Sequence, residues 1–283
     1  CGKSTLVNLI PRFYDVTDGK ITIDGKDIRN VSQHELREKL GYVPQKAVLF
    51  SGDIASNILY GNPDGSEAEK SGNGIRIFSR YLKDAGYVQK KNFKLYTGNG
   101  PVEVTFLNED GSRLRVSMGK LSFWSDEIPV IGERREVINE DMVFGRTLYP
   151  VTCVSIGNPH CVIPMREISR PLVCKIGDYS EIARYFPNRI NTQIMKVIDK
   201  ENIAIEIFER GAGYTRASGT GACAAAGVAY KLGLTNSKVI VHMPGGELQV
   251  EVEDDWNVYM TGDVFYVAKM TLSNEFAERL RAL

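Results

Sequence analysis

The stretch ERGAGYTRASGTGACAAAGVAYKLG, from Glu209 to Gly233, organises this chain around a glycine-rich loop and a helix. It follows an alternating apolar run, Ile203, Ile205 and Ile207, which is typical of a strand. After the loop, the Ala-rich run 222–232 predicts a helix that Gly233 closes. Polar side chains are scarce in this run, so we expect the helix to be buried on most of its sides.

The loop residues Ser218-Gly219-Thr220-Gly221 would lie at the N-terminus of that helix. Free backbone N–H groups and the positive end of the helix dipole favour an anion there. The pattern occurs a second time as S-G-N-G at 71–74, where it opens the run 75–85, and Gly86 closes that run. The equal spacing indicates an internal repeat of one functional unit.

Two helices aimed at one point would hold a carboxylate from both sides, with Ser71 and Ser218 opposite each other. The alternative is two ordinary glycine-rich helix starts, because short glycine motifs are common. Spacing alone leaves both interpretations open.

The bulk composition is that of a globular protein of one large or two medium domains. Balanced charge, with a formal net charge of +0, argues against nucleic acid or an anionic membrane as partner. No apolar run has the length of a membrane span. The five cysteines contain no C-x-x-C pair, which favours a reduced, cytoplasmic location. The start CGKST lacks Met and a signal-peptide pattern, so we expect a fragment.

The first five residues match the end of a phosphate-binding loop, and residues 1–61 as a whole resemble a truncated nucleotide-binding domain of an exporter-type ABC transporter. The resemblance implies a partial P-loop NTPase fragment that would bind ATP and Mg²⁺ through Gly2, Lys3, Ser4, Thr5 and Gln45. The signature motif, the strand ending in Asp-Glu and the switch histidine of that family do not follow. We therefore expect no ATP hydrolysis, and ATP and Mg²⁺ matter only if this fragment is functional.

Residues 62–283 carry a second resemblance, in blocks that keep their order along the chain. The blocks are N-P-D-G-S-E at 62–67, S-G-N-G-I-R at 71–76, G-N-P-H at 157–160, F-P-N-R-I-N at 186–191, E-R-G-A-G at 209–213, G-T-G at 219–221, P-G-G at 244–246 and M-T-G at 260–262. This set resembles the diaminopimelate epimerase family. It implies an amino-acid epimerase that works without pyridoxal phosphate and converts LL- to meso-diaminopimelate, a lysine and peptidoglycan precursor.

The fold that the resemblance implies is α/β (α+β) with two pseudo-symmetric lobes. Each lobe would be a curved, mostly antiparallel sheet around one central helix, 75–85 or 222–232. The first lobe, 62–148 with 265–283, lacks its opening strands, and the second lobe spans 149–264. The segments 102–107 and 114–118 predict a hairpin within the first lobe. The resemblance also implies a homodimer.

The site residues implied by the resemblance fall into two groups, and the implied ligand is a small amino acid with neither cofactor nor metal. The catalytic group is Ser71, Ser218, His160 and Glu209. The substrate-binding group is Asn62, Gly72, Asn73, Asn158, Asn191, Glu209, Arg210, Gly219 and Thr220.

Ser71 and Ser218 depart from the family, which has a cysteine at each of these positions. A thiol has a pKa near 8.5 that a helix N-terminus lowers, whereas a hydroxyl is a far weaker acid and needs an adjacent base. His160 would be that base for Ser71, and Glu209 for Ser218. Three interpretations stay open: a subgroup with altered substrate or chemistry, a chain that has lost activity, and an inactive recombinant or misassembled chain.

Two cysteines lie near these motifs. Cys223 lies inside the Ala-rich helix and is interpreted as a small buried apolar residue. Cys161 follows His160, and we expect it in a strand core, with an approach to the site as the alternative.

Overall fold

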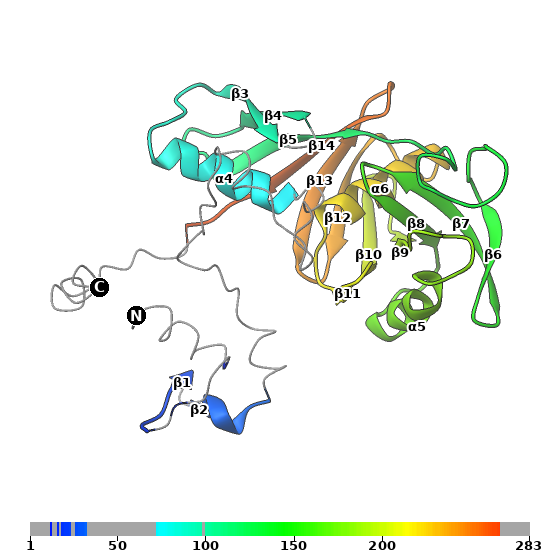
Figure 1. Ribbon diagram of the computed structural model, residues 1–283. Coiled ribbons are helices and arrows are strands. Elements are labelled where there is room, and N and C mark those ends of the chain that lie inside the picture. Colours follow the sequence, from blue (N-terminus) through cyan, green and yellow to red (C-terminus); the bar gives the residue numbers. More distant parts are fainter. Residues whose placement is uncertain are drawn as a thin grey trace. The chain divides into compact units, whose positions relative to one another are not determined.

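The computed structural model describes residues 12, 16, 18–23, 26–32, 72–97 and 100–266 (Figure 1). The chain divides into two compact units, Cys1–Asn57 with Tyr266–Leu283, and Ile58–Phe265. In the first unit, β1 (Thr22–Ile23) and β2 (Lys26–Asp27) form a short antiparallel hairpin that precedes the 3-10 turn η1 (Ile28–Asn30). The expected nucleotide-binding residues lie outside the described residues, as do residues 267–283 of the segment 265–283 that is expected to belong to the first lobe.

The second unit is built on one twelve-stranded sheet of described residues, ordered β3-β4-β5-β14-β13-β12-β10-β9-β8-β7-β6, with β11 paired to β10. The pairs β8–β9 and β10–β12 are parallel and the other pairs are antiparallel, so the expected mostly antiparallel sheet is confirmed. The strands are β3 (Asn92–Thr97), β4 (Gly100–Phe106), β5 (Arg113–Lys120), β6 (Glu140–Phe144), β7 (Thr147–Ser155), β8 (Pro159–Pro164), β9 (Asn191–Val197), β10 (Asn202–Glu209), β11 (Gly213–Thr215), β12 (Lys238–Met243), β13 (Gly246–Val252) and β14 (Asn257–Asp263).

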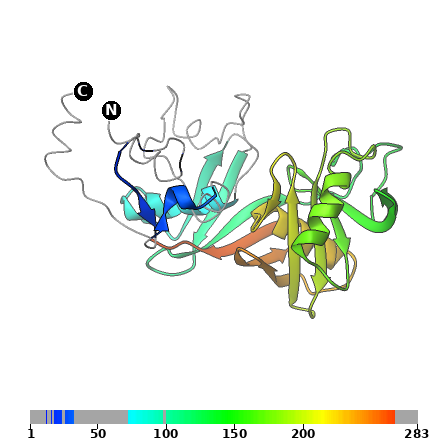
Figure 2. The same ribbon diagram turned by 90° about the horizontal axis from the view of Figure 1, so that it is seen from below.

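Strands β5 and β14 join the two expected lobes into this single sheet. They pair in antiparallel register from Lys120 with Asn257 to Arg113 with Asp263. Figure 2 shows β14 running between the strands of the two lobes. The lobes therefore share one hydrogen-bonded sheet, which the sequence did not predict. The β6–β7 hairpin lies across the lobe boundary expected at residue 148, and the division at that residue remains a prediction.

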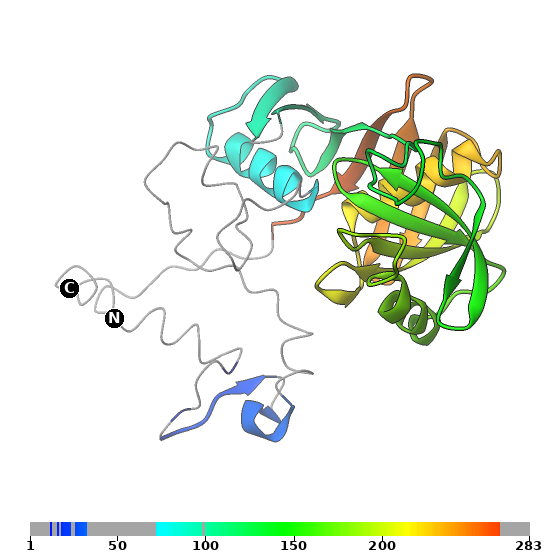
Figure 3. The ribbon, with the colours of Figure 1, turned by 45° about the vertical axis from the view of Figure 1, so that its right-hand side comes forward.

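Helix α6 (Gly219–Lys231) fills the centre of the second lobe. Eleven of its residues are buried, and it contacts strands from β7 to β14. The alternating isoleucines of β10 face the same core, whereas α5 (Arg170–Ser180) covers the other face of β9 and β10 (Figures 1 and 3). The prediction of a buried helix is confirmed. Its alanine side chains are small, so the surrounding strands can approach the helix closely.

Helix α4 (Gly72–Asp84) differs from this arrangement. It packs on β5 through the buried Ile75, while Ile77 and Tyr81 on its outer side are 59% and 56% exposed. The described strands cover α4 from one side, and the expectation that the first lobe wraps its central helix remains a prediction. The predicted β4–β5 hairpin is confirmed. Among the described residues, no helix is long and apolar enough to cross a membrane.

Candidate active site

Ser218 is the N-cap of α6. Its backbone is extended, with φ −144° and ψ 123°, and its hydroxyl accepts a hydrogen bond from the Gly221 N–H at 3.2 Å. This bond satisfies one of the N–H groups that have no partner within a helix end. The helix consequently begins at Gly219, earlier than the predicted Ala222, because the cap compensates for the low helix propensity of two glycines.

The repeated motif forms the same element twice. Both α4 and α6 have 13 residues, and both are followed by a glycine with positive φ, 78° at Gly86 and 67° at Gly233. A left-handed residue of this kind ends many helices, and glycine adopts it without strain. The predicted helix ends are confirmed. Ser71, the counterpart of Ser218, lies outside the described residues.

The first turns of α4 and α6 meet above Met260 of β14. A Cβ atom on Gly219 would lie 3.2 Å from the Met260 sulfur and 3.7 Å from the Cα of Gly72. A Cβ atom on Gly72 would lie 2.5 Å from the Met260 Cε. The glycines therefore allow two positively polarised helix ends to approach each other, the arrangement predicted from the repeat.

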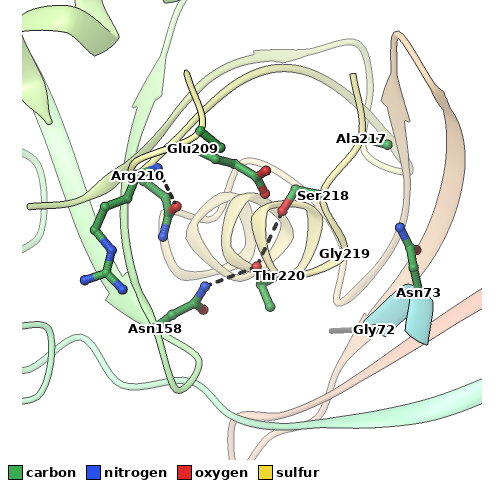
Figure 4. A pocket seen from close by; sticks show the side chains of 11 residues that line it. Gly72, Asn73, Asn158, Glu209, Arg210, Ala217, Ser218, Gly219 and Thr220 are labelled. Carbon is green, nitrogen blue, oxygen red and sulfur yellow. Dashed lines mark hydrogen bonds between the residues drawn. The ribbon is translucent and has the colours of Figure 1, made fainter. Parts of the chain in front are cut away.

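A pocket of about 330 Å³ opens at this meeting point (Figure 4). Nine of the sequence-predicted site residues line it, together with two that the sequence did not single out, Ala212 and Ala217. The nine are Gly72, Asn73, Asn158, Asn191, Glu209, Arg210, Ser218, Gly219 and Thr220. The predicted Asn62 lies outside the described residues. The residues come from the first turns of α4 and α6, the ends of β9 and β10, and the loops before β8 and on either side of β11.

The polar side chains of the pocket form short hydrogen-bonded chains. Asn158 Nδ2 donates to Thr220 Oγ1 at 3.4 Å, and Thr220 Oγ1 lies 3.5 Å from the Ser218 hydroxyl. Figure 4 shows the Glu209 carboxylate pointing toward Ser218. A carboxylate beside a hydroxyl at a helix N-terminus is an arrangement in which a proton can pass between the two groups.

The opposite wall is fixed by Asn191, which links two segments. Its Nδ2 donates to the Pro159 carbonyl at 2.8 Å, and its Oδ1 accepts from the Arg210 N–H at 3.0 Å. The Arg210 side chain is held in turn by the Asn188 carbonyl, which accepts from Nη1 at 2.9 Å. This wall presents a cation and amide groups, a set suited to a second charged end of a ligand.

His160 lies behind the wall rather than in it. The ring is 1% exposed, and Nε2 and Nδ1 lie 3.0 Å from Asn158 Oδ1 and 3.1 Å from Gln193 Oε1. Burial lowers the pKa of His160 to about 4, although the hydrogen bond to Gln193 raises it, so the ring is neutral near pH 7. Its described contacts support Asn158, and its predicted role as base for Ser71 remains a prediction.

Gln193 was missed by the sequence analysis. It belongs to no motif block, and only the pairing of β8 with β9 brings it beside His160.

None of the residues that line the pocket is a cysteine. Cys153, Cys161 and Cys223 are buried, and Cys153 pairs with Cys161 across β7 and β8 within an apolar core. The strand-core interpretation of Cys161 and the buried-apolar interpretation of Cys223 are confirmed. Burial raises the pKa of the Cys153 thiol. No cluster of His, Cys, Asp and Glu suited to a metal ion occurs among the residues that the structure describes.

Sequence comparison places these residues in a known family. The family model for diaminopimelate epimerase matches residues 40–124 and 152–267. The chain belongs to the diaminopimelate epimerase family. The match begins at residue 40, within the segment 1–61 that resembles an ABC transporter, and the comparisons do not show the ABC transporter resemblance.

Relatives of this family are similar to the chain over most of its length. It is 50% identical over 214 residues to diaminopimelate epimerase 2 of Nostoc sp., a match that covers 76% of this chain and 75% of the relative. It is 39% identical over 204 residues to the diaminopimelate epimerase of Moorella thermoacetica, covering 71% and 73%. Among solved structures, a probable proline racemase from Agrobacterium radiobacter K84 has a similar fold, with a TM-score of 0.54 at 15% identity over 75% of this chain and 70% of the other.

Proposed function

We propose that this pocket binds diaminopimelate and that the chain interconverts its LL and meso forms, as an isomerase without pyridoxal phosphate. The observation that carries the proposal is the meeting of two helix N-termini at Gly72 and Gly219, with Ser218 beside them. An α-carboxylate held there faces two sets of N–H groups and two positive dipole ends. The second amino-acid end of the ligand would contact Asn158, Asn191 and Arg210 on the other wall.

The proposed reaction removes the α-proton on one face and returns a proton on the other. Ser218 takes the α-proton while Glu209 takes the hydroxyl proton, and the C–H electrons move into the α-carboxylate to form an enediolate. The Ser71 hydroxyl then gives its proton to the opposite face of the α-carbon. The Ser71 alkoxide that remains takes a proton from water, and Glu209 releases its proton to water, which restores the starting state. The helix ends stabilise the charge that accumulates on the carboxylate oxygens.

Serine in place of cysteine makes this a slow reaction. An alkoxide is scarce near neutral pH unless a base removes its proton during the step, whereas a thiolate is readily formed at a helix N-terminus. An altered substrate, a loss of activity and an inactive recombinant or misassembled chain remain the alternatives.

Exchange of the α-hydrogen of diaminopimelate with solvent deuterium tests the proposal. We expect slow exchange by the natural chain, and a gain from Ser71→Cys with Ser218→Cys that exceeds the product of the two single changes, because removal and return of the proton act as a unit. Ala217→Ser is a matched control, since it changes a pocket wall without adding a thiol. Binding without any gain from the double replacement would favour a different substrate, and absence of binding would contradict the proposal.

For residues 1–61 we infer no ATPase activity, although the resemblance of Gly2, Lys3, Ser4, Thr5 and Gln45 to a nucleotide site is retained as a proposal. Turnover of ATP with Mg²⁺ that Lys3→Ala abolishes would contradict this inference.

A further inference from the structure

Arg76, in the second turn of α4, is a buried cation that the proposed mechanism does not use. Its side chain is 7% exposed. Nη2 donates to Asn73 Oδ1 at 2.7 Å, Nη1 lies 3.4 Å from the Met260 sulfur, and Nε has no partner in the described part of the chain. A guanidinium carries five N–H donors, so an amide oxygen and a weakly accepting sulfur leave it poorly satisfied.

The charge of Arg76 is also poorly balanced. No described carboxylate forms an ion pair with it, and the nearby Asp263 already pairs with Arg113 at 2.9 Å. Burial lowers the pKa of Arg76, and Cys223 and Asp263 offset this only in part. Buried charges are normally paired, because an isolated ion loses its hydration. The protein nevertheless provides space for this one, since a Cβ atom on Gly262 would lie 3.2 Å from both Cζ and Nε of Arg76.

The position of the guanidinium indicates what balances it. Its contact with the Met260 sulfur places it next to the side chain that lies beneath both Gly72 and Gly219. Its other contact, Asn73, lines the pocket. Arg76 is therefore one side chain away from both helix ends, where a cation adds to the positive potential of the dipoles. An anion in the pocket would relieve this accumulation of like charge.

We propose that Arg76 is a positioning residue for the α-carboxylate: it orients Asn73 and supplies the buried positive charge that a carboxylate at the two helix ends neutralises. The inference deepens the proposed function and rests on it for the identity of the ligand. Since the α-carboxylate gains charge when the α-proton leaves, the effect of Arg76 grows along the reaction as well as on binding.

Three variants test this role. Arg76→Met removes the charge and keeps the length of the side chain, Arg76→Lys keeps the charge without the planar fork, and Arg80→Met removes a charge from the same helix at its ion pair with Asp84. The measurements are the melting temperature without ligand, the dissociation constant for diaminopimelate, and the stabilisation by acetate compared with neutral acetamide at constant ionic strength.

We expect Arg76→Met to melt no lower than the natural chain without ligand, because an unpaired buried charge is replaced by an apolar side chain. Its affinity for diaminopimelate should fall roughly 10- to 100-fold, the usual effect of removing a residue that supports a binding group, and its stabilisation by acetate should disappear. Arg76→Lys should be intermediate, and Arg80→Met should bind as the natural chain does.

Other results separate this inference from the proposed function. Unchanged affinity in Arg76→Met, or a large fall in its melting temperature without ligand, would show a structural role and overturn the inference. Stabilisation by acetate that depends on Arg76, without binding of diaminopimelate, would overturn the proposed ligand and support the role of Arg76. A natural chain that responds to neither compound would overturn both.

Discussion

Gly219 of α6 lies so close to Gly72 of α4 that a methyl group on Gly219 would be 3.7 Å from the Gly72 Cα. The same methyl group would lie 3.2 Å from the Met260 sulfur, a closer contact than most Cβ atoms make. The separation of the two helix ends is therefore set by the absence of side chains at two positions and by one methionine below them.

Gly219→Ala should destabilise the protein by about 1–3 kcal/mol, the usual effect of an added methyl group in a packed site, despite the better helix propensity of alanine. Urea unfolding measures this change. Combining Gly219→Ala with Met260→Ala should be less harmful than the sum of the single changes, because the second removes the atoms that the first meets. Additive losses would contradict the close contact.

His160 should make stability depend on pH between about 4 and 6.5. Burial lowers its pKa from 6.5 to about 4, so below pH 6.5 the unfolded chain binds a proton that the folded chain does not. The free energy of unfolding should fall as pH drops through this window, by an amount on the order of 3 kcal/mol. We therefore expect the free energy of unfolding, measured with urea, to depend more steeply on pH in the natural chain than in His160→Asn between about pH 4 and 6.5.

His242→Gln is the control for this measurement. It removes a histidine whose ring contacts Glu247 and Asn202, neither of which lines the pocket. A pH dependence that His242→Gln abolishes and His160→Asn leaves intact would contradict the assignment.

Ser218→Ala should remove the N-cap of α6 and lower stability by about 0.5–2 kcal/mol, because the Gly221 N–H loses its acceptor. Ser218→Asn should retain most of the stability, since asparagine also caps helices, while losing any proton transfer by the hydroxyl. Thermal melting and deuterium exchange measured on both variants separate the two roles. Equal stability of Ser218→Ala and the natural chain would show that the cap contributes little.

Thiol reagents should distinguish the cysteines of the folded protein by burial. Cys153, Cys161 and Cys223 should resist alkylation because they are enclosed and because burial raises the pKa of Cys153. Cys174, which is partly exposed on α5, should react. Peptide mapping after brief alkylation measures this, with a sample unfolded in urea as the reference in which all react. Rapid labelling of Cys161 would contradict the described core.

Much of the pocket lining could be predicted because its residues lie in short sequence blocks that resemble the motifs of the family. Gly219 and Thr220 follow a capping serine, and Asn191 and Arg210 belong to two of these blocks. Helix ends were predictable for a related reason, since Gly86 and Gly233 adopt a left-handed conformation that other residues avoid.

The rest depended on contacts between distant segments. Gln193 reaches His160 only because β8 and β9 are parallel neighbours, and Arg76 meets Met260 only because β14 crosses to the first lobe. The pairing of β5 with β14 has no local signal, because alternation of apolar residues defines the faces of a strand and leaves its neighbour unspecified.

The pairing of β5 with β14 also determines the order in which parts of the fold can form during synthesis. Lys120 pairs with Asn257, so a ribosome must add the whole second lobe before β5 gains its partner. Until then the α6 end of the pocket can form, but no shared sheet holds α4 opposite α6. Met260, which contacts both helices, has not yet been synthesised. Pairing of segments so far apart in the chain is slow, and domains form in the order of synthesis. The pocket is thus completed only after β14 has been synthesised, and a chain that stops before β14 would carry both helix motifs without joining them.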